Sequence, residues 1–241
     1  MINSNITVIA MTWNRDVYRL SNLLWTLAHQ SLVPDQVIIV DQSPDQIMQL
    51  AALQVCDDYS VAHVSMPSDT FSMPKAFNKG LELVTSEYVM FTGIDMMFSE
   101  DFIKILSQRL SPNSFVNAMM GYYPEHFFMG NDNFFDHWGA ITRLCDPSLI
   151  TRALSPGACQ AMPTSWIRMV NGYDERYSGG LGGIDDEMRS RAVKCGLNIT
   201  WIEWGESQVI HQWHKESPLK GVTSHLFDAN PPMVANTGGD D

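Results

Sequence analysis

Residues 76–95, AFNKGLELVTSEYVMFTGID, decide the fold because they run from a helix through a polar turn into a strand that ends near an aspartate. The segment from about Lys75 to Val84 predicts a helix, and the apolar run Tyr88 to Phe91 predicts a buried strand. Helices that alternate with such strands indicate βαβ units and a parallel sheet. Ligands bind these sheets beyond the carboxyl ends of the strands, which is where Asp95 stands.

The same alternation precedes this stretch. Apolar runs at Ile6 to Met11, Val37 to Val40 and about Val61 to Val64 predict three more strands, the second of which ends at Asp41. Leucines spaced at three and four over residues 20–27 predict a helix. We therefore expect a single α/β domain, in which a mainly parallel sheet is flanked by helices.

The second half of the chain has a less regular pattern. It predicts helices from about Glu100 to Leu110, from a cap at Ser165 to Gly172, and from Asp185 to Gly196. It predicts strands near Phe115 to Met120, Ala158 to Met162, Ile199 to Trp204 and Val209 to Gln212. The Pro, Gly and Asn content from about Glu216 predicts a loosely ordered tail. The expected division is a domain at 1–215, with halves 1–110 and 111–215, and a tail at 216–241.

The composition and net charge disfavour some classes of function. The 241 residues include 27 acidic and 15 basic side chains, for a formal net charge of −12. Such a protein repels phosphate, so an anionic substrate needs a metal ion, a backbone nest or a few placed cations, and general nucleic-acid binding is disfavoured. The sequence has no long apolar run, no leader-like N-terminus and no Cys-x-x-Cys pair. We expect a cytoplasmic protein with reduced thiols and no transmembrane segment.

Two aspartates follow predicted strands. Asp41 could accept hydrogen bonds from a nucleoside, or could be an ordinary turn former or helix cap. Asp95 follows an apolar strand, so its carboxylate could hold a divalent cation that bridges a diphosphate. Each signal is weak when taken alone.

A glycine-rich loop precedes two further aspartates. Glycines at 179, 180, 182 and 183 allow close backbone approach to a ligand and movement of the segment. Asp185 and Asp186 then begin a helix, where the helix dipole stabilises carboxylates. One of them could act as a general base, and the alternative is simple charge complementarity at the helix start.

Other candidate residues are less specific. In the extended segment HQWH, His211 and His214 are three apart, so we expect only one of them to reach a metal ion. Lys75 and Asn78 could meet phosphate or could lie on plain helix surface. The aromatic segment from Tyr122 to Gly139, which includes Trp138, could stack on sugar rings or form a packing patch.

Taken together, these motifs resemble those of glycosyltransferase family 2, whose nucleotide-sugar-binding fold is known as GT-A. ITVIAMTWNR is similar to the first strand and turn of that family, with Thr12 where proline is common, and PDQVIIVDQS is similar to its second strand. AFNKGLELVTSEYVMFTGID resembles the segment that ends in the metal-binding Asp-x-Asp, and NGYDERYSGGLGGIDDE resembles the segment that carries the catalytic base. The resemblance covers approximately residues 5–215.

The resemblance implies an inverting glycosyltransferase that uses a nucleotide diphosphate sugar, with a preference for UDP, and Mn2+ or Mg2+. Residues 1–110 would bind the donor and 111–215 the acceptor, a glycan or another hydroxyl compound. The implied base is Asp185, and the implied metal ligands are Asp95 with His211 as first choice and His214 as second. The implied substrate contacts are Thr12, Asn14, Arg15, Asp41, Lys75, Asn78, Asp186 and Trp138.

Three departures from the family pattern leave alternatives open. Gly93 replaces the first aspartate of Asp-x-Asp, while Leu181 and Ile184 replace residues near the acceptor. A non-catalytic nucleotide- or carbohydrate-binding descendant is therefore one alternative. A nucleotidylyltransferase is another, although the turn after the first strand lacks the glycine-rich phosphate loop that it would need.

Overall fold

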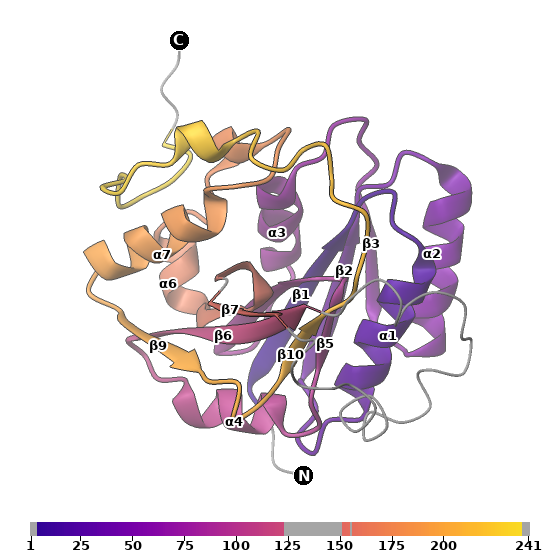
Figure 1. Cartoon of the computed structure of the whole chain (residues 1–241), viewed down its shortest axis with the longest axis horizontal. Coiled ribbons are helices and arrows are strands. Elements are labelled where there is room, and N and C mark those ends of the chain that lie inside the picture. The colour runs from indigo at the N-terminus through magenta and orange to yellow at the C-terminus, as the bar shows by residue number, and fades with distance from the viewer. Residues whose placement is uncertain (1–3, 123–150, 155, 238–241) are drawn as a thin grey trace.

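One curled sheet organises the chain, and its N-terminal half is parallel (Figure 1). The computed structural model describes residues 4–122, 151–154 and 156–237. β1 pairs in parallel with β2 and β4, and β2 pairs in parallel with β3. The strands of this half are β1 (Ile6–Thr12), β2 (Gln36–Asp41), β3 (Ala62–Ser65) and β4 (Tyr88–Gly93). The predicted α/β class with a mainly parallel sheet is confirmed.

The C-terminal half of the sheet is mixed and divides at β6. The order through the sheet is β3-β2-β1-β4-β8-β6-β10-β5, with β7 and β9 also on β6. Near its start β6 pairs with β8 and β9, and near its end it pairs with β10 and β7. The strands of this half are β5 (Met96–Phe98), β6 (Ser114–Tyr122), β7 (Thr151–Leu154), β8 (Gln160–Pro163), β9 (Asn198–Ile202) and β10 (Val209–His211).

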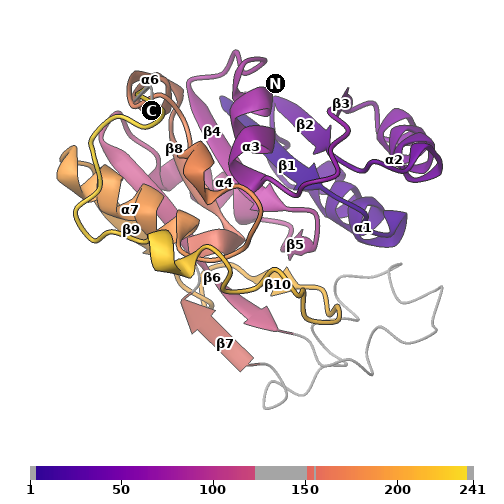
Figure 2. The same cartoon turned by 90° about the horizontal axis from the view of Figure 1, so that it is seen from above.

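Helices cover both faces of the sheet (Figure 2). One buried cluster joins the sheet to α1 (Val17–Ala28), α2 (Gln46–Asp58) and α4 (Phe102–Arg109). The other cluster joins it to α3 (Met73–Leu81), α6 (Thr164–Met169) and α7 (Ile184–Lys194). A Cβ atom at Gly80 would lie 2.6 Å from Ile9 Cγ2, so α3 packs directly against β1 only because Gly80 has no side chain.

Two helices differ from the prediction. α2 was not expected, because only two of its residues, Ala52 and Cys56, are buried, while Ile47 and Leu50 face solvent. This leaves no regular apolar stripe to recognise. α6 begins at Thr164, and its N-cap is Pro163, two residues before the predicted cap at Ser165. The cap lies earlier because β8 ends at Pro163 and leads into the helix without a loop.

The segment from Glu216 to Thr237 has little regular structure and is mostly exposed, but several of its residues are bonded to the domain. Leu181 and Lys220 form an isolated parallel bridge. The Ala235 N–H donates to the carbonyl oxygen of Val170 at 2.9 Å, and the Lys194 ammonium donates to the carbonyl oxygen of Pro231 at 2.9 Å. Across the described ranges, no helix has both the length and the apolar character that crossing a bilayer requires.

Candidate active site

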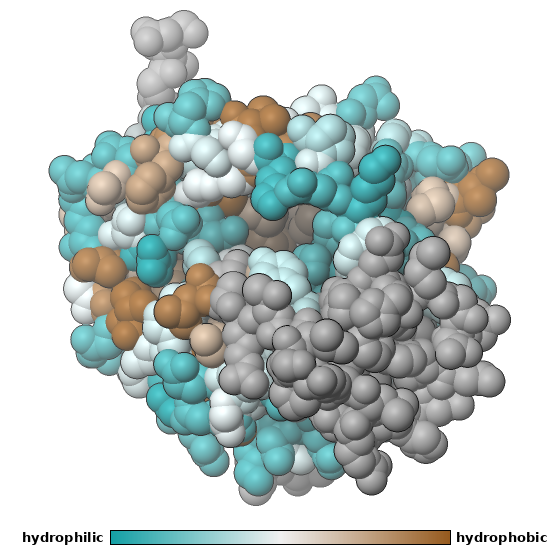
Figure 3. Space-filling view, viewed as in Figure 1, coloured by the Kyte–Doolittle hydropathy of each residue, from teal (hydrophilic) through white to brown (hydrophobic). Residues whose placement is uncertain are grey.

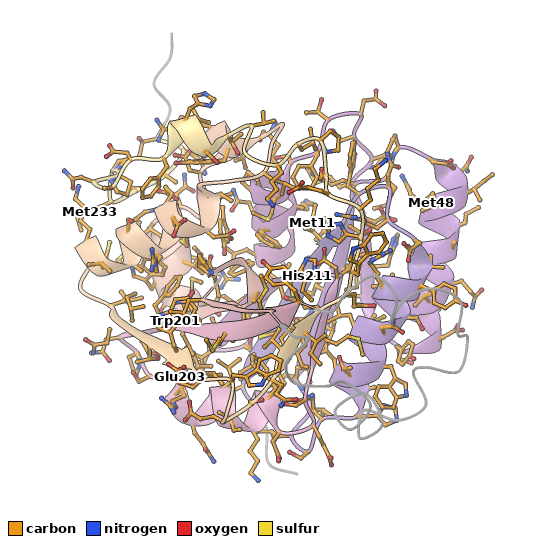
Figure 4. All side chains as sticks on the ribbon, in the orientation of Figure 1. Met11, Met48, Trp201, Glu203, His211 and Met233 are labelled. Carbon is orange, nitrogen blue, oxygen red and sulfur yellow. The ribbon has the colours of Figure 1, made fainter. Side chains whose placement is uncertain are left out.

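A cavity of about 790 Å³ lies beyond the carboxyl ends of β1 and β4. Its wall is formed by the turn after β1, the start of α3, the end of β4, the start of α7 and residues 213–220. The face drawn in Figure 3 is hollowed near its centre, with hydrophilic residues along the rim. Figure 4 shows His211 and Met11, both of which line the cavity, near the middle of this face. The sheet edge that parallel topology favours is therefore the edge that carries the cavity.

Asp95 meets both candidate histidines in this wall. The Nε2 atoms of His214 and His211 lie 3.2 Å and 3.7 Å from the same carboxylate oxygen, Asp95 Oδ2. One ligand atom from each of the three residues lies within 4.8 Å of the others. All three side chains are 16–17% exposed, so the cluster is open to the cavity but shielded from bulk water. A carboxylate with two imidazoles is a donor set that fits a divalent metal ion.

Gln212 explains why both histidines reach Asp95. Its backbone N–H donates to the Asp95 carbonyl oxygen at 2.7 Å, and its buried side chain donates to the carbonyl oxygens of Arg19 and Ile94. The side-chain amide of Asn22 donates to Gln212 Oε1 at 2.6 Å. β10 ends at His211, so the alternation of an extended strand no longer applies at His214. Both histidines therefore lie beside Asp95, although a continuous strand would have turned them to opposite faces.

Charges around Asp95 keep it ionised. Burial raises the pKa of Asp95, but the hydrogen bond from His214 and the charges of His211 and Arg15 outweigh burial, and the net pKa lies well below the ordinary value. Burial lowers the pKa of His211 more than the charge of Asp95 raises it. The neutral imidazole that results is the form that binds metal ions.

Asp185 stands at the start of α7, on another part of the wall. Gly183 is the N-cap, and the carbonyl oxygen of Asp185 accepts a hydrogen bond from Gln160 Nε2 at 2.9 Å. Tyr173 in turn donates its hydroxyl to Gln160 Oε1 at 2.8 Å. Burial, and then the charge of Asp186, raise the pKa of Asp185 to about 7. A carboxyl group with this pKa can both accept and release a proton near neutral pH.

Gly157 leaves room for the Asp185 carboxylate. A Cβ atom at position 157 would lie 2.8 Å from Asp185 Oδ2. Gly157 could not be identified from local pattern, because its role depends on a contact with Asp185, which is distant in the sequence.

Three predicted substrate contacts lie away from the cavity wall. Asp186 points to the surface and pairs with Arg189 at 2.8 Å. Lys75 is exposed on α3 and does not line the cavity. Asn78 bonds with the backbone of Tyr173 in both directions and donates to Glu175, so it joins α3 to the loop that follows α6. Lys75 is therefore a surface residue of α3, and Asn78 stabilises the fold.

Asp41 is also outside the wall, although β2 ends where predicted. Its side chain is fully buried and accepts a hydrogen bond from the Ser43 N–H at 2.8 Å, while His63 Nε2 lies 3.3 Å away. Burial raises the pKa of Asp41, but the hydrogen bonds from His63 and Ser43 lower it by more, so the net pKa lies below the ordinary value. The carboxylate is thus occupied within the protein.

The turn after β1 contributes part of the predicted contacts. Asn14 and Arg15 line the cavity, and the Arg15 guanidinium lies 3.4 Å from His214 Nε2. Thr12 is buried and does not line the cavity. Trp138 lies outside the described residues.

The glycine-rich loop serves the C-terminal segment as well as the cavity. A Cβ atom at Gly180 would lie 2.7 Å from Thr223 Cγ2, and one at Gly182 would overlap Ser224 Oγ. Thr223 donates its hydroxyl to the Gly182 carbonyl oxygen at 2.8 Å. The glycines therefore permit close packing of residues 219–224, in addition to exposing Gly182 to the cavity.

Several wall residues were not predicted. Trp13 stacks edge-to-face on Phe71 with ring centroids 5.8 Å apart, and its indole N–H donates to the Ser68 carbonyl oxygen at 3.0 Å. Residues 215–220 line the cavity because the C-terminal segment returns to it. Trp13 could have been predicted from the sequence, because it lies next to the predicted contact Asn14. The return of the C-terminal segment to the cavity could not, because it is a contact between distant parts of the chain.

Comparison with known proteins agrees with this geometry. Residues 7–154, more than half of the chain, match the profile of glycosyl transferase family 2. Residues 154–215 match the profile described as the N-terminal domain of galactosyltransferase. A search of curated protein sequences gives no significant match.

Solved structures with a similar fold include three of S. aureus TarS. TarS 1–349 in complex with UDP-GlcNAc has a TM-score of 0.63 and 16% identity, over 89% of this chain and 60% of that one. TarS 1–349 has a TM-score of 0.61 and 17% identity, over 86% and 60% of the two chains. A further TarS structure has a TM-score of 0.58 and 17% identity, over 86% and 36%. The chain thus spans less than two thirds of each of these neighbours.

Proposed function

The chain belongs to glycosyltransferase family 2, and from this premise we propose that it moves a sugar from a UDP-sugar to an acceptor hydroxyl with inversion at the anomeric carbon. The predicted GT-A fold is confirmed by the family match and the TarS neighbours. The single observation that carries the proposal is that Asp185 and the Asp95–His211–His214 cluster line one cavity.

A nucleotide diphosphate fits the charged side of the cavity. Arg15 and Lys215 line it together with Lys220, whose ammonium pairs with Glu216 in the same wall, in a protein with a net charge of −12. These placed cations meet the requirement that an acidic protein has for an anionic substrate. The UDP-GlcNAc complex of TarS supports UDP as the nucleotide and makes UDP-GlcNAc the first donor to test.

Asp95, His211 and His214 would hold a divalent cation, Mn2+ or Mg2+, beside the diphosphate. The ion would neutralise the diphosphate and stabilise the negative charge that develops on the leaving group. Arg15, which lies beside His214, would add a fixed positive charge to the same region. Asn14 stands next to Arg15 in the wall and would supply hydrogen bonds to the donor.

Asp185 would act as the general base. The acceptor oxygen attacks the anomeric carbon and its proton passes to the Asp185 carboxylate, while the bond from that carbon to the diphosphate oxygen breaks. The buried environment that raises the pKa of Asp185 to about 7 also makes its ionised form more basic than an ordinary carboxylate. On this proposal residues 1–110 form the donor half and residues 111–215 the acceptor half.

The apolar wall suits the sugar or the acceptor. Trp13, Phe71 and Leu181 line the cavity beside polar groups, and flat apolar faces pack well on pyranose rings. The predicted aromatic segment begins at Tyr122, which also lines the cavity, and continues outside the described residues.

Thermal unfolding of the full chain tests the donor proposal. We expect UDP and UDP-GlcNAc to raise the melting temperature in the presence of Mn2+, while ADP and GDP have little effect. A ligand present at about 100 times its Kd adds about 2.7 kcal/mol of stability. UDP release from UDP-GlcNAc with added acceptors then measures turnover. Failure of every nucleotide to shift the melting curve would contradict the proposal.

A further inference from the structure

Gly93 stands in direct contact with the carboxylate of Asp95. A Cβ atom built at position 93 would lie 2.5 Å from Asp95 Oδ1, closer than real Cβ contacts. The other carboxylate oxygen, Oδ2, faces both histidines. The absence of a side chain at Gly93 therefore lets the Asp95 carboxylate fold back over the strand end while it faces the imidazoles.

The second histidine changes the chemistry of the cluster. The three side chains offer one carboxylate oxygen and two imidazole nitrogens, where an Asp-x-Asp site would rely mainly on carboxylate oxygens. Mg2+ prefers oxygen ligands and retains several waters, whereas imidazole favours first-row transition ions. Replacing a carboxylate by imidazole thus lowers the relative affinity for Mg2+.

The orientation of His214 fits this assignment. Its Nδ1 atom lies 2.8 Å from the carbonyl oxygen of Lys215, which can only accept a hydrogen bond. This contact orients the imidazole so that its other nitrogen, Nε2, lies 3.2 Å from Asp95 Oδ2.

Resting on the proposed function, we propose that this is a transition-metal site that discriminates against Mg2+, with His214 as the ligand that sets the preference and Gly93 as a positioning residue for Asp95. The glycine does not merely remove a metal ligand. It gives the remaining carboxylate the space to share an ion with His211 and His214.

Visible absorption of Co2+ bound to the full-length chain tests the proposal without any need for turnover. Co2+ is expected to give ligand-field bands distinct from those of the aqueous ion, and about a hundredfold excess of Mg2+ leaves them unchanged. Mn2+ and Zn2+ are expected to compete. Displacement of Co2+ by comparable concentrations of Mg2+, or a spectrum identical to aqueous Co2+, would overturn the proposal.

Two variants separate the contributions of His214 and Gly93. His214→Asp keeps three ligands but replaces one nitrogen with oxygen, so the preference for Co2+ over Mg2+ is expected to fall about tenfold or more. Gly93→Ala forces the Asp95 carboxylate to move and is expected to weaken Co2+ binding by about 10- to 100-fold, as changes to groups that orient ligands do.

Gly205→Ala is the matched control, because a Cβ atom there meets nothing within 4 Å. It is expected to bind Co2+ like the unmodified chain. Circular dichroism confirms that each variant is folded. Equal Co2+ affinity in Gly93→Ala and Gly205→Ala would remove the positioning role, and unchanged selectivity in His214→Asp would remove the ligand role.

The outcome is distinguishable from failure of the proposed function. A chain that binds Co2+ selectively but gives no response to UDP compounds retains the metal assignment and loses the donor assignment. A chain that responds to UDP-GlcNAc but binds Mg2+ as well as Co2+ retains the donor assignment and loses the selectivity.

Discussion

The backbone N–H of Gln212 donates a hydrogen bond to the carbonyl oxygen of Asp95 across 2.7 Å. This bond joins the segment that carries both histidines to the end of β4, which carries the carboxylate. The Gln212 side chain adds bonds to Asn22 and to the backbone of Ile94. The geometry of the cluster therefore depends on a residue that is itself 1% exposed and cannot touch a substrate.

Gln212→Ala is expected to loosen the cluster. It removes three side-chain hydrogen bonds and leaves the buried Asn22 amide without its partner, so the free energy of unfolding should fall by about 1–3 kcal/mol. Co2+ affinity should fall by about 10- to 100-fold. Urea unfolding and Co2+ titration measure the two effects. The exposed Gln54→Ala is the control, and equal Co2+ affinity in the two variants would show that Gln212 does not position the ligands.

Asp185→Asn is expected to lower kcat by about 10²- to 10⁴-fold, because an amide cannot accept the acceptor proton. Donor affinity should change little, since the base acts on the acceptor. Steady-state turnover and UDP-GlcNAc binding measure the two quantities. Asp57→Asn, an exposed carboxylate on α2, serves as the control. Full turnover by Asp185→Asn would exclude Asp185 as the base.

The pH profile of turnover should report the pKa of Asp185. Because the base works only when ionised, kcat/KM should rise with pH and level off above the pKa of about 7. The charge of Asp186 contributes to that raised pKa, so Asp186→Asn should move the rise to lower pH. Tyr173, which also interacts with Asp185, stays neutral in this range because burial raises its pKa. Identical profiles for the two proteins would argue against this control of Asp185.

The same carboxyl group should affect stability. Its pKa is raised from 3.8 to about 7 on folding, so the folded chain binds more protons than the unfolded chain between about pH 4 and 7. The contribution of Asp185 to stability is therefore fully present below about pH 4 and is lost as pH rises to 7. Asp185→Asn should gain stability relative to the unmodified chain across this range. Urea unfolding at several pH values tests this, and a constant difference between the two proteins would contradict it.

Gly182→Ala should detach the C-terminal segment from the loop. Gly182 has φ +115°, and its added Cβ would overlap Ser224, whereas Gly196 has φ +83° and nothing within 4 Å. Gly196→Ala therefore carries backbone strain alone, about 1–2 kcal/mol. Gly182→Ala should lose about 1–3 kcal/mol more and be cleaved faster by protease near residues 219–224. Equal stability of the two variants would show that the segment packs without requiring this glycine.

Local pattern was enough to predict the framework. β1, β2 and β4 were identified because parallel strands buried on both faces are continuous apolar runs. Asp95 and Asp185 were identified because one follows such a strand and the other begins a helix. The pattern failed at α2, whose outer face carries the exposed apolar residues Ile47 and Leu50.

The rest of the site depends on contacts between distant parts of the chain. The prediction for Asp41 identified the strand end but not His63, which lies on the neighbouring strand and faces its carboxylate. In the sequence, Gly93 indicated only the loss of a metal ligand. Its closeness to Asp95 Oδ1 could not be predicted, because this contact is a property of the folded backbone. The bonds that attach the segment after Glu216 were not predicted because its partners, such as Val170 and Leu181, are far from it in sequence.

The contact between Arg15 and His214 joins positions 199 residues apart. The cavity wall is therefore completed by two segments that lie near opposite ends of the described chain. During synthesis, the parallel half can be complete while the ribosome has yet to produce either histidine. The nascent chain would thus acquire its capacity for a metal ion only after His214 has been synthesised. A shortened version that stops before residue 213 would keep every described strand of the sheet while lacking His214 and the other wall residues up to Lys220.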